Sequence, residues 1–196
     1  MPEDAQLSDS DGVFLVNTAR TAVTEFLSNG KRIKLESESE KKFSFNSGVF
    51  VTLNNADGLR GCIGFPMPDK NLSNGIIDAA IAAATEDPRF SPVKINELND
   101  IVFEVTVLTP PVEITVSDPM EYLEKIKIGR DGLIIRNSFS SGLLLPQVPV
   151  EYGWNVEEFL QHTCEKAVLE KDAWKNEKVK IEKFEGIVYK EETNGS

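Results

Sequence analysis

A short apolar stretch, Leu59–Phe65, carries groups that could do chemistry: the charge of Arg60, the thiol of Cys62 and two glycines. Because Cβ atoms alternate across a strand, we expect Arg60, Cys62 and Gly64 to share one face. A guanidinium beside a thiol favours the thiolate, which is the nucleophilic form of cysteine. Gly61 and Gly64 would leave room for a ligand or a second backbone. The alternative is that Cys62 is a small buried hydrophobe and the glycines serve tight packing.

A second polar group inside an apolar run is Glu104, which lies within Ile101–Leu108, with Thr106 on the same face. A carboxylate is costly to bury in a strand unless it is paired or hydrogen-bonded. We therefore expect Glu104 to serve as a proton donor or acceptor for Cys62. Burial against Arg60 would set the pKa of its carboxyl group. The alternatives are a purely structural Arg60–Glu104 ion pair or an edge-facing Glu104.

Four further residues are candidates for a site. Gln147, expected to be buried between two prolines, either satisfies backbone groups at a rigid bend or contacts a ligand. Arg89 either pairs with Asp87 at a helix end or stands at the mouth of the site. Cys164 falls on the apolar stripe of a predicted helix and is assigned to the core. His162 lies off that stripe and is assigned to the surface.

The elements that position these residues are predicted from periodicity and turn signals. We expect a helix over 11–29, a charged connection over 31–42, a hairpin of strands 48–53 and 59–65, a helix over 71–86 and a strand over 101–108. The second half repeats this order with a short helix over 119–126, strands over 132–137 and 143–145, a helix over 155–169, a helical piece over 171–174, and closing strands over 179–184 and 187–189. The sequence therefore predicts an α+β fold of two hairpin, helix and strand repeats, about 43–110 and 128–190, with mixed, largely antiparallel sheets and an internal duplication. We assign residues 10–190 to a single domain.

The composition excludes several classes of function. A formal net charge of −11 at pH 7 repels phosphate backbones, so nucleic-acid binding is not expected. No apolar run is long enough to cross a bilayer, and with two widely separated cysteines we expect a cytoplasmic protein with reduced thiols. One histidine argues against a metal site. No phosphate-binding glycine motif, nucleophile elbow or Cys-x-x-Cys motif is present, so no cofactor is assigned.

The chain resembles the AMMECR family, named for the chromosomal region of Alport syndrome, intellectual disability, midface hypoplasia and elliptocytosis. The resemblance covers about residues 11–190, and Gly129–Gly132 is similar to the archaeal branch, with Asp131 where many relatives carry His. Val168 replaces a usual Gly, which we interpret as a packing change. Five segments carry the match: Leu59–Gly64, which holds the motif cysteine, Asp87–Phe90, Glu104–Thr109, Gly142–Val148, and Gly153–Leu160.

The resemblance implies two β-rich repeats related by a pseudo-dyad and a site around Arg60, Cys62 and Glu104. It also implies a shared pathway with Memo-like and radical-SAM proteins. It assigns no reaction, substrate or oligomeric state. Two hypotheses follow: a cysteine-dependent enzyme with Cys62 as nucleophile or redox thiol, or a non-catalytic module that binds a protein or ligand. In either case Arg60, Gly61, Gly64, Thr106 and Gln147 are expected to line the ligand site.

Overall fold

The computed structural model describes residues 7–192, and the chain divides into two compact units. Among the described residues, unit 1 is formed by 7–108 together with 187–192. Unit 2 is the intervening segment Thr109–Gly186. The long strand β7, Lys180–Lys190, therefore begins in unit 2 and ends in unit 1.

Helix α1, Asp9–Asn29, confirms the predicted N-terminal helix. It begins with a capping box at Ser8, and it ends at Gly30, whose φ of 67° is the left-handed conformation that glycine adopts readily. The charged connection after it contains an additional short helix, α2, Ser37–Lys42, which the sequence pattern did not predict. Because α2 buries none of its residues, it has no apolar stripe that could have signalled it.

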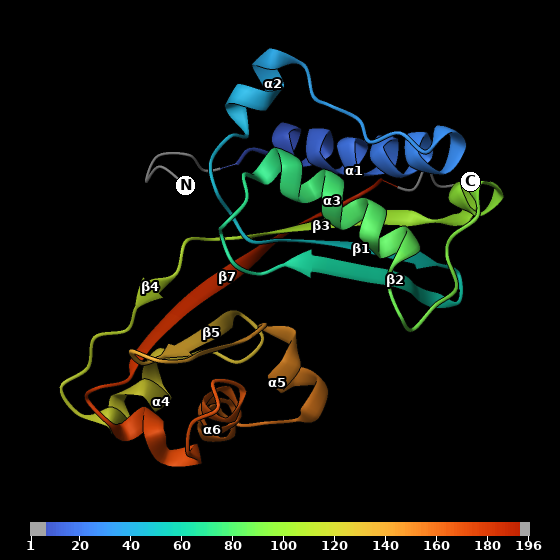
Figure 1. The fold of residues 1–196 in the computed structure, drawn as a ribbon. Helices are drawn as coiled ribbons and strands as arrows, with labels where there is room; N and C mark the ends of the chain where they lie inside the picture. Colours follow the sequence, from blue (N-terminus) through green and yellow to red (C-terminus); the bar gives the residue numbers. More distant parts are fainter. Residues whose placement is uncertain (1–6, 193–196) are drawn as a thin grey trace. The chain divides into compact units, whose positions relative to one another are not determined.

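The sheet of unit 1 confirms the predicted hairpin. Strands β1, Val49–Asn55, and β2, Gly58–Phe65, pair antiparallel, and β1 also pairs antiparallel with β3, Val102–Leu108. One face of this sheet is apolar and buried, and helices α1 and α3 cover it (Figure 1). Helix α3, Leu72–Thr85, follows the predicted boundaries closely and is capped by Asn71. A short 3-10 helix, η1, Ile95–Asp100, precedes β3.

Unit 2 contains a second antiparallel hairpin with its own core. Strand β5 pairs with both β6 and β7, and β7 also pairs with the short strand β4. Buried residues of β5, α6 and β7 form the core of this unit together with Tyr122 and Trp174. The elements of unit 2 before β7 are β4, Val112–Glu113; η2, Pro119–Glu121; α4, Tyr122–Lys125; β5, Asp131–Arg136; β6, Ser141–Leu144; α5, Gln147–Tyr152; α6, Val156–Lys166; and η3, Lys171–Lys175.

The two units share one strand order. In each, the first strand of the hairpin is central, the second strand lies on one side of it, and the strand that follows a helix lies on the other side. The α+β fold with largely antiparallel sheets and packed helices is confirmed. The prediction of two separate closing strands is wrong, because β7 continues through Gly186 without a break.

Candidate functional site

The polar row of unit 1, as we name Cys62, Thr52 and Glu104, crosses the sheet on the face away from the helices. Thr52 on β1 is directly opposite Cys62 on β2 and directly opposite Glu104 on β3. All three residues are partly exposed, whereas their neighbours Val51 and Leu53 are fully buried. Strand pairing therefore places Cys62 and Glu104 in one line, with a hydroxyl between them.

The thiol of Cys62 contacts the Thr52 hydroxyl, with 3.2 Å between Sγ and Oγ1. The backbone N–H of Cys62 donates away from β1, so Thr52 and Cys62 form a non-hydrogen-bonded pair, the kind in which side chains come closest. Either the hydroxyl or the thiol can donate in this contact, so the sulfur has a hydrogen-bonding partner on the neighbouring strand.

Asp87 and Arg89 cap the edge of β2 at Cys62. The Cys62 N–H donates to Asp87 Oδ2 at 2.8 Å, and Arg89 Nη2 donates to the Cys62 carbonyl oxygen at 3.4 Å. Arg89 also donates to both carboxylate oxygens of Asp87, at 3.0 and 2.7 Å. The Asp87–Arg89 pair expected at a helix end is therefore confirmed. The sequence did not predict that the pair also holds the backbone of the cysteine.

The carboxylate of Asp87 is deeply buried and ionised. Hydrogen bonds from the Arg89 side chain, and then from the Cys62 and Arg89 backbones, hold the pKa of Asp87 far below its usual range, outweighing the opposing effect of burial. The same pairing raises the pKa of Arg89. Asp87 is 4% exposed, so few other groups can replace these partners. The edge at Cys62 is thus fixed by a charged clamp.

Arg60 is not part of the polar row, and the alternative of a structural Arg60–Glu104 ion pair is wrong, because Arg60 pairs with Glu97. The register of β1 and β2 shifts between Leu53 and Asn54, so Arg60 is the extra residue of a β-bulge. Its guanidinium instead donates to Glu97 at 2.9 and 3.3 Å and to the Ser91 carbonyl oxygen at 3.0 Å. Arg60 therefore anchors the segment before β3.

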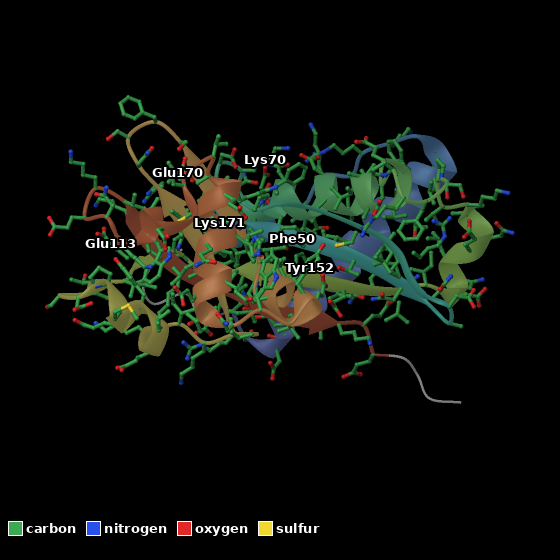
Figure 2. The ribbon with its side chains drawn as sticks, turned by 90° about the horizontal axis from the view of Figure 1, so that it is seen from below. Phe50, Lys70, Glu113, Tyr152, Glu170 and Lys171 are labelled. Carbon is green, nitrogen blue, oxygen red and sulfur yellow. The ribbon has the colours of Figure 1, made fainter. Side chains whose placement is uncertain are left out.

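The two glycines serve packing. Of the two alternatives expected for them, room for a second backbone is confirmed at Gly61, and room for a ligand is wrong at both. A Cβ at Gly61 would lie 2.2 Å from the carbonyl oxygen of Ala83 in α3. A Cβ at Gly64 would lie 2.2 Å from the ring of Phe50, the β1 residue labelled in Figure 2. Gly61 thus lets the helix approach the sheet, and the space above Gly64 is filled by an aromatic ring.

The remaining predicted residues fall in different places. Thr106 opposes Phe50 and is partly exposed, one step along the sheet face from Glu104. Gln147 is exposed as the first residue of α5, so the expectation of a buried amide is wrong. His162 stacks on Trp154 with 3.9 Å between ring centroids, and its Nδ1 lies 2.8 Å from Glu165 Oε2.

Cys164 is a core residue, as predicted. It is fully buried in the helix α6 face that packs on β5 and β6. Burial raises the pKa of its thiol to about 11. At neutral pH Cys164 is therefore a neutral, sealed thiol, which gives the partly exposed Cys62 an internal reference.

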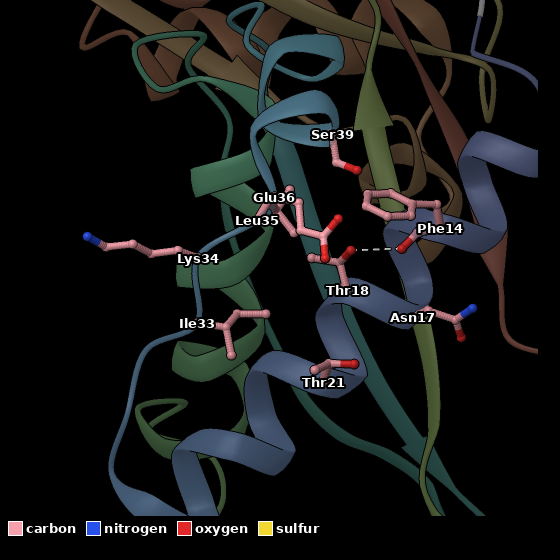
Figure 3. A pocket seen from close by; sticks show the side chains of 9 residues that line it. All are labelled: Phe14, Asn17, Thr18, Thr21, Ile33, Lys34, Leu35, Glu36 and Ser39. Carbon is pink, nitrogen blue, oxygen red and sulfur yellow. Dashed lines mark hydrogen bonds between the residues drawn. The ribbon is translucent and has the colours of Figure 1, made fainter.

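A separate hollow of about 360 Å³ lies in unit 1, along α1. Figure 3 shows that the Lys34 side chain points away from it. The Thr18 hydroxyl in its wall already donates to the Phe14 carbonyl oxygen at 2.9 Å. The hollow is lined by Phe14, Asn17, Thr18, Thr21, Ile33, Lys34, Leu35, Glu36 and Ser39.

Residues 7–192 were compared with the requirements of a metal site and of a membrane-spanning helix. They contain no group of three or more His, Cys, Asp or Glu side chains that could hold a metal ion. Within the same residues, no helix combines the length and apolar character needed to cross a membrane.

Comparison with known proteins gives consistent matches along the chain. A model of the AMMECR1 family matches residues 16–189. A protein of Methanocaldococcus jannaschii is 52% identical over 187 residues, which cover 94% of this chain and 92% of that protein. A protein of Pyrococcus abyssi is 48% identical over 193 residues, covering 96% and 94% respectively.

A solved structure has the same fold. The crystal structure of an uncharacterized protein from Pyrococcus horikoshii matches with a TM-score of 0.78 at 49% sequence identity, covering 95% of this chain and 94% of that one. These three relatives come from archaea, in line with the branch that Gly129–Gly132 indicated.

Proposed function

Because the chain belongs to the AMMECR1 family, we propose that its function resides in the polar row of unit 1 and that Cys62 is the reactive group. The observation that carries the proposal is the 3.2 Å contact between the Cys62 thiol and the Thr52 hydroxyl on a partly exposed sheet face. A thiol kept only for packing would be sealed, as Cys164 is.

In this enzyme hypothesis Cys62 is a nucleophile. Its Sγ forms a bond to an electrophilic centre of the substrate while the bond to the leaving group breaks, and the thiol proton ends on that leaving group. Thr52 lies between Cys62 and Glu104, so the proton reaches the carboxylate through the hydroxyl or through the bound substrate. Glu104 then returns the proton as a general acid.

Asp87 limits the kind of reaction. Its carboxylate occupies the backbone N–H of Cys62, a donor that many thiol enzymes direct at a developing oxyanion. Arg89 lies beside Cys62 and is about half exposed, so it replaces Arg60 as the cation available to an anionic substrate group. Arg60 keeps a structural role in this proposal.

The enzyme hypothesis is tested by the alkylation rate of Cys62 with iodoacetamide, followed by peptide mass spectrometry. Thr52→Val removes the hydroxyl at nearly constant volume and should slow alkylation about fivefold, the factor that corresponds to one net hydrogen bond. Thr52→Ser should retain the wild-type rate. Thr106→Val, one step away on the same face, is the matched control. An unchanged rate in Thr52→Val would remove the support that this contact gives to the proposal.

The alternative function is a non-catalytic binding module that uses the same row. The occupied Cys62 N–H favours it, because a backbone donor is missing from the place where acyl-transfer chemistry needs one. The Memo-like and radical-SAM proteins suggested by the resemblance are the proposed partners. A location in the reducing cytoplasm suits the two free thiols.

Calorimetric titration of each recombinant partner separates the two hypotheses. Binding through the row predicts that Cys62→Ser keeps the affinity, whereas Glu104→Gln weakens it about tenfold through loss of a charged hydrogen bond. Glu124→Gln, an exposed residue of unit 2, is the charge-matched control. Equal affinity in the wild type and in Glu104→Gln would exclude the row as the interface.

We also infer that the two units arose by internal duplication. Their common strand order supports this inference, and so do glycines at matching places. Gly61 faces α3 and Gly142 faces the end of α6, each within 2.3 Å of helix backbone measured from a Cβ position. Structure-guided alignment of the two units across many relatives should align these glycines; if other positions align better, no duplication need be invoked.

A further inference from the structure

The hollow of about 360 Å³ in unit 1 lies between helix α1 and the segment 33–39. Ile33 and Leu35 from the segment, and Phe14 from the helix, are partly buried and pack on the core of the unit. The Phe14 ring stacks on the buried Phe43, with 5.3 Å between ring centroids, so its position is fixed. The hollow is therefore largely apolar, and its volume falls in the lower part of the range of small-molecule sites.

Two polar groups in the wall offer hydrogen-bond acceptors. The Thr18 hydroxyl spends its proton on the Phe14 carbonyl oxygen at 2.9 Å, so its lone pairs remain for a ligand. In Figure 3 the Glu36 carboxylate points toward α1, on the same side as this hydroxyl. An ionised carboxylate can only accept hydrogen bonds. The hollow therefore suits a ligand group that donates them.

The charge of Glu36 is not neutralised within unit 1, where the described residues give its side chain no ion pair and no hydrogen bond. Lys34 also lines the hollow, but its side chain points away from it (Figure 3). Arg32 and Lys42, which flank the segment, each pair with an aspartate. A carboxylate beside apolar surface attracts a cation more strongly than one in open water does.

We propose that this hollow binds a small organic amine in its protonated form. The ammonium group donates to the Glu36 carboxylate and to the Thr18 hydroxyl oxygen. The apolar body of the amine packs on Phe14, Ile33 and Leu35. The hollow lies on the helical side of unit 1, whereas the polar row lies on the opposite face of the sheet, so this second binding function does not depend on the thiol.

The test follows the backbone amide signals of Thr18, Thr21 and Leu35 by nuclear magnetic resonance in the full chain labelled with ¹⁵N. Phenethylamine, which is protonated at neutral pH, is titrated as the probe. Its control is 2-phenylethanol, which has nearly the same shape and no charge. Phenethylamine should shift these amides and bind about tenfold more tightly than 2-phenylethanol, as a hydrogen bond to a charged group implies.

Two pairs of variants locate the binding. Glu36→Gln keeps the size of the side chain and should remove the preference for the amine. Glu38→Gln, exposed on α2 and outside the lining, should keep it, and this control corrects for the general attraction of cations to a chain of net charge −11. Thr21→Phe fills the hollow and should abolish the shifts, whereas Ser28→Phe, exposed on α1 outside the lining, should leave them unchanged.

Either of two results would overturn the assignment of the ammonium group to Glu36: equal binding of the two probes to the wild type, or an unchanged preference for the amine in Glu36→Gln. A titration in which neither probe shifts the amides along the hollow would overturn the site itself.

Discussion

At the centre of unit 1 the strand β1 places Thr52 between Cys62 and Glu104, whereas at the matching register in unit 2 the strand β5 places Ile134 between Leu143 and Glu182. The strand order is the same in both. Strand pairing therefore does not require a hydroxyl and a thiol at these positions, since the aliphatic Ile134 and Leu143 occupy them in unit 2.

The two glutamates show the same contrast. Glu182 pairs with Arg136 on the neighbouring strand and is 8% exposed. Glu104 is more exposed, and among the described residues of unit 1 its carboxylate has no ion pair or hydrogen bond. A paired carboxylate is explained by structure, but a carboxylate left available on the same face as a thiol is suited to act on a ligand.

Packing against the helix is the feature that both units keep. Gly61→Ala and Gly142→Ala should each destabilise the fold by about 2–3 kcal/mol, because the added Cβ meets helix backbone that cannot move aside. Urea unfolding monitored by circular dichroism measures both. Gly75→Ala in α3 is the control and should cost less, since its added Cβ would meet only the Val49 side chain, at 3.0 Å. A harmless change at only one of the two glycines would break the correspondence between the units.

The clamp at the edge of β2 should have the next largest effect. Asp87→Asn removes a charged acceptor from the Cys62 N–H and from Arg89, and we expect a loss of about 2 kcal/mol in unfolding free energy. Arg89 is half exposed, which keeps the loss below that of a fully buried pair. Asp172→Asn removes an exposed pair with Lys175 and should cost less than about 0.5 kcal/mol. Equal losses of unfolding free energy in Asp87→Asn and Asp172→Asn would show that the clamp stabilises the fold no more than an exposed ion pair does.

The free energy of unfolding should depend on pH through the ionisation of Asp87. Its folded pKa is lowered, so its contribution is fully present above the ordinary value of 3.8 and is lost as pH falls below that value. Wild-type unfolding free energy should therefore drop more steeply below about pH 4 than that of Asp87→Asn. Urea midpoints from pH 2.5 to 6 would check this, and parallel curves for the two proteins would contradict it.

The smallest effect concerns the end of α6. Val168 has a φ of 60°, which strains the backbone of a β-branched residue. Its side chain is 89% exposed, so the interpretation of this residue as a packing change is wrong. Val168→Gly should stabilise the chain by about 1 kcal/mol, and Val168→Ala by less. Thermal unfolding gives both values. A lower midpoint for Val168→Gly would mean that the strain is absent.

The fold was largely predictable because its signals are local. The apolar stripe and Gly30 defined α1, and the Asp57-Gly58 turn between two apolar runs defined the hairpin. The site was less predictable, since alternation alone put Arg60 beside Cys62. Arg60 is instead the extra residue of a β-bulge and pairs with Glu97, and sequence periodicity cannot reveal a bulge.

Other features depend on contacts far apart in the chain. No spacing rule links Asp87 to the backbone of Cys62, so the clamp emerged only from the folded structure. Likewise, no sequence pattern predicts that the Trp174 indole Nε1–H is buried without a hydrogen-bond partner among residues 7–192. Gln147 was misplaced because flanking prolines suggested a buried bend, whereas Pro146 caps a short exposed helix.

The most direct test of the reactive-thiol proposal is the alkylation of both cysteines in the folded protein across pH, resolved by peptide mass spectrometry. Cys164 is sealed, and burial raises its pKa to about 11, so it should stay unmodified until the chain unfolds. Cys62 should react at pH 7 at least about tenfold faster than Cys164. A Cys62 as inert as Cys164 would contradict the proposal and leave the polar row as a binding surface alone.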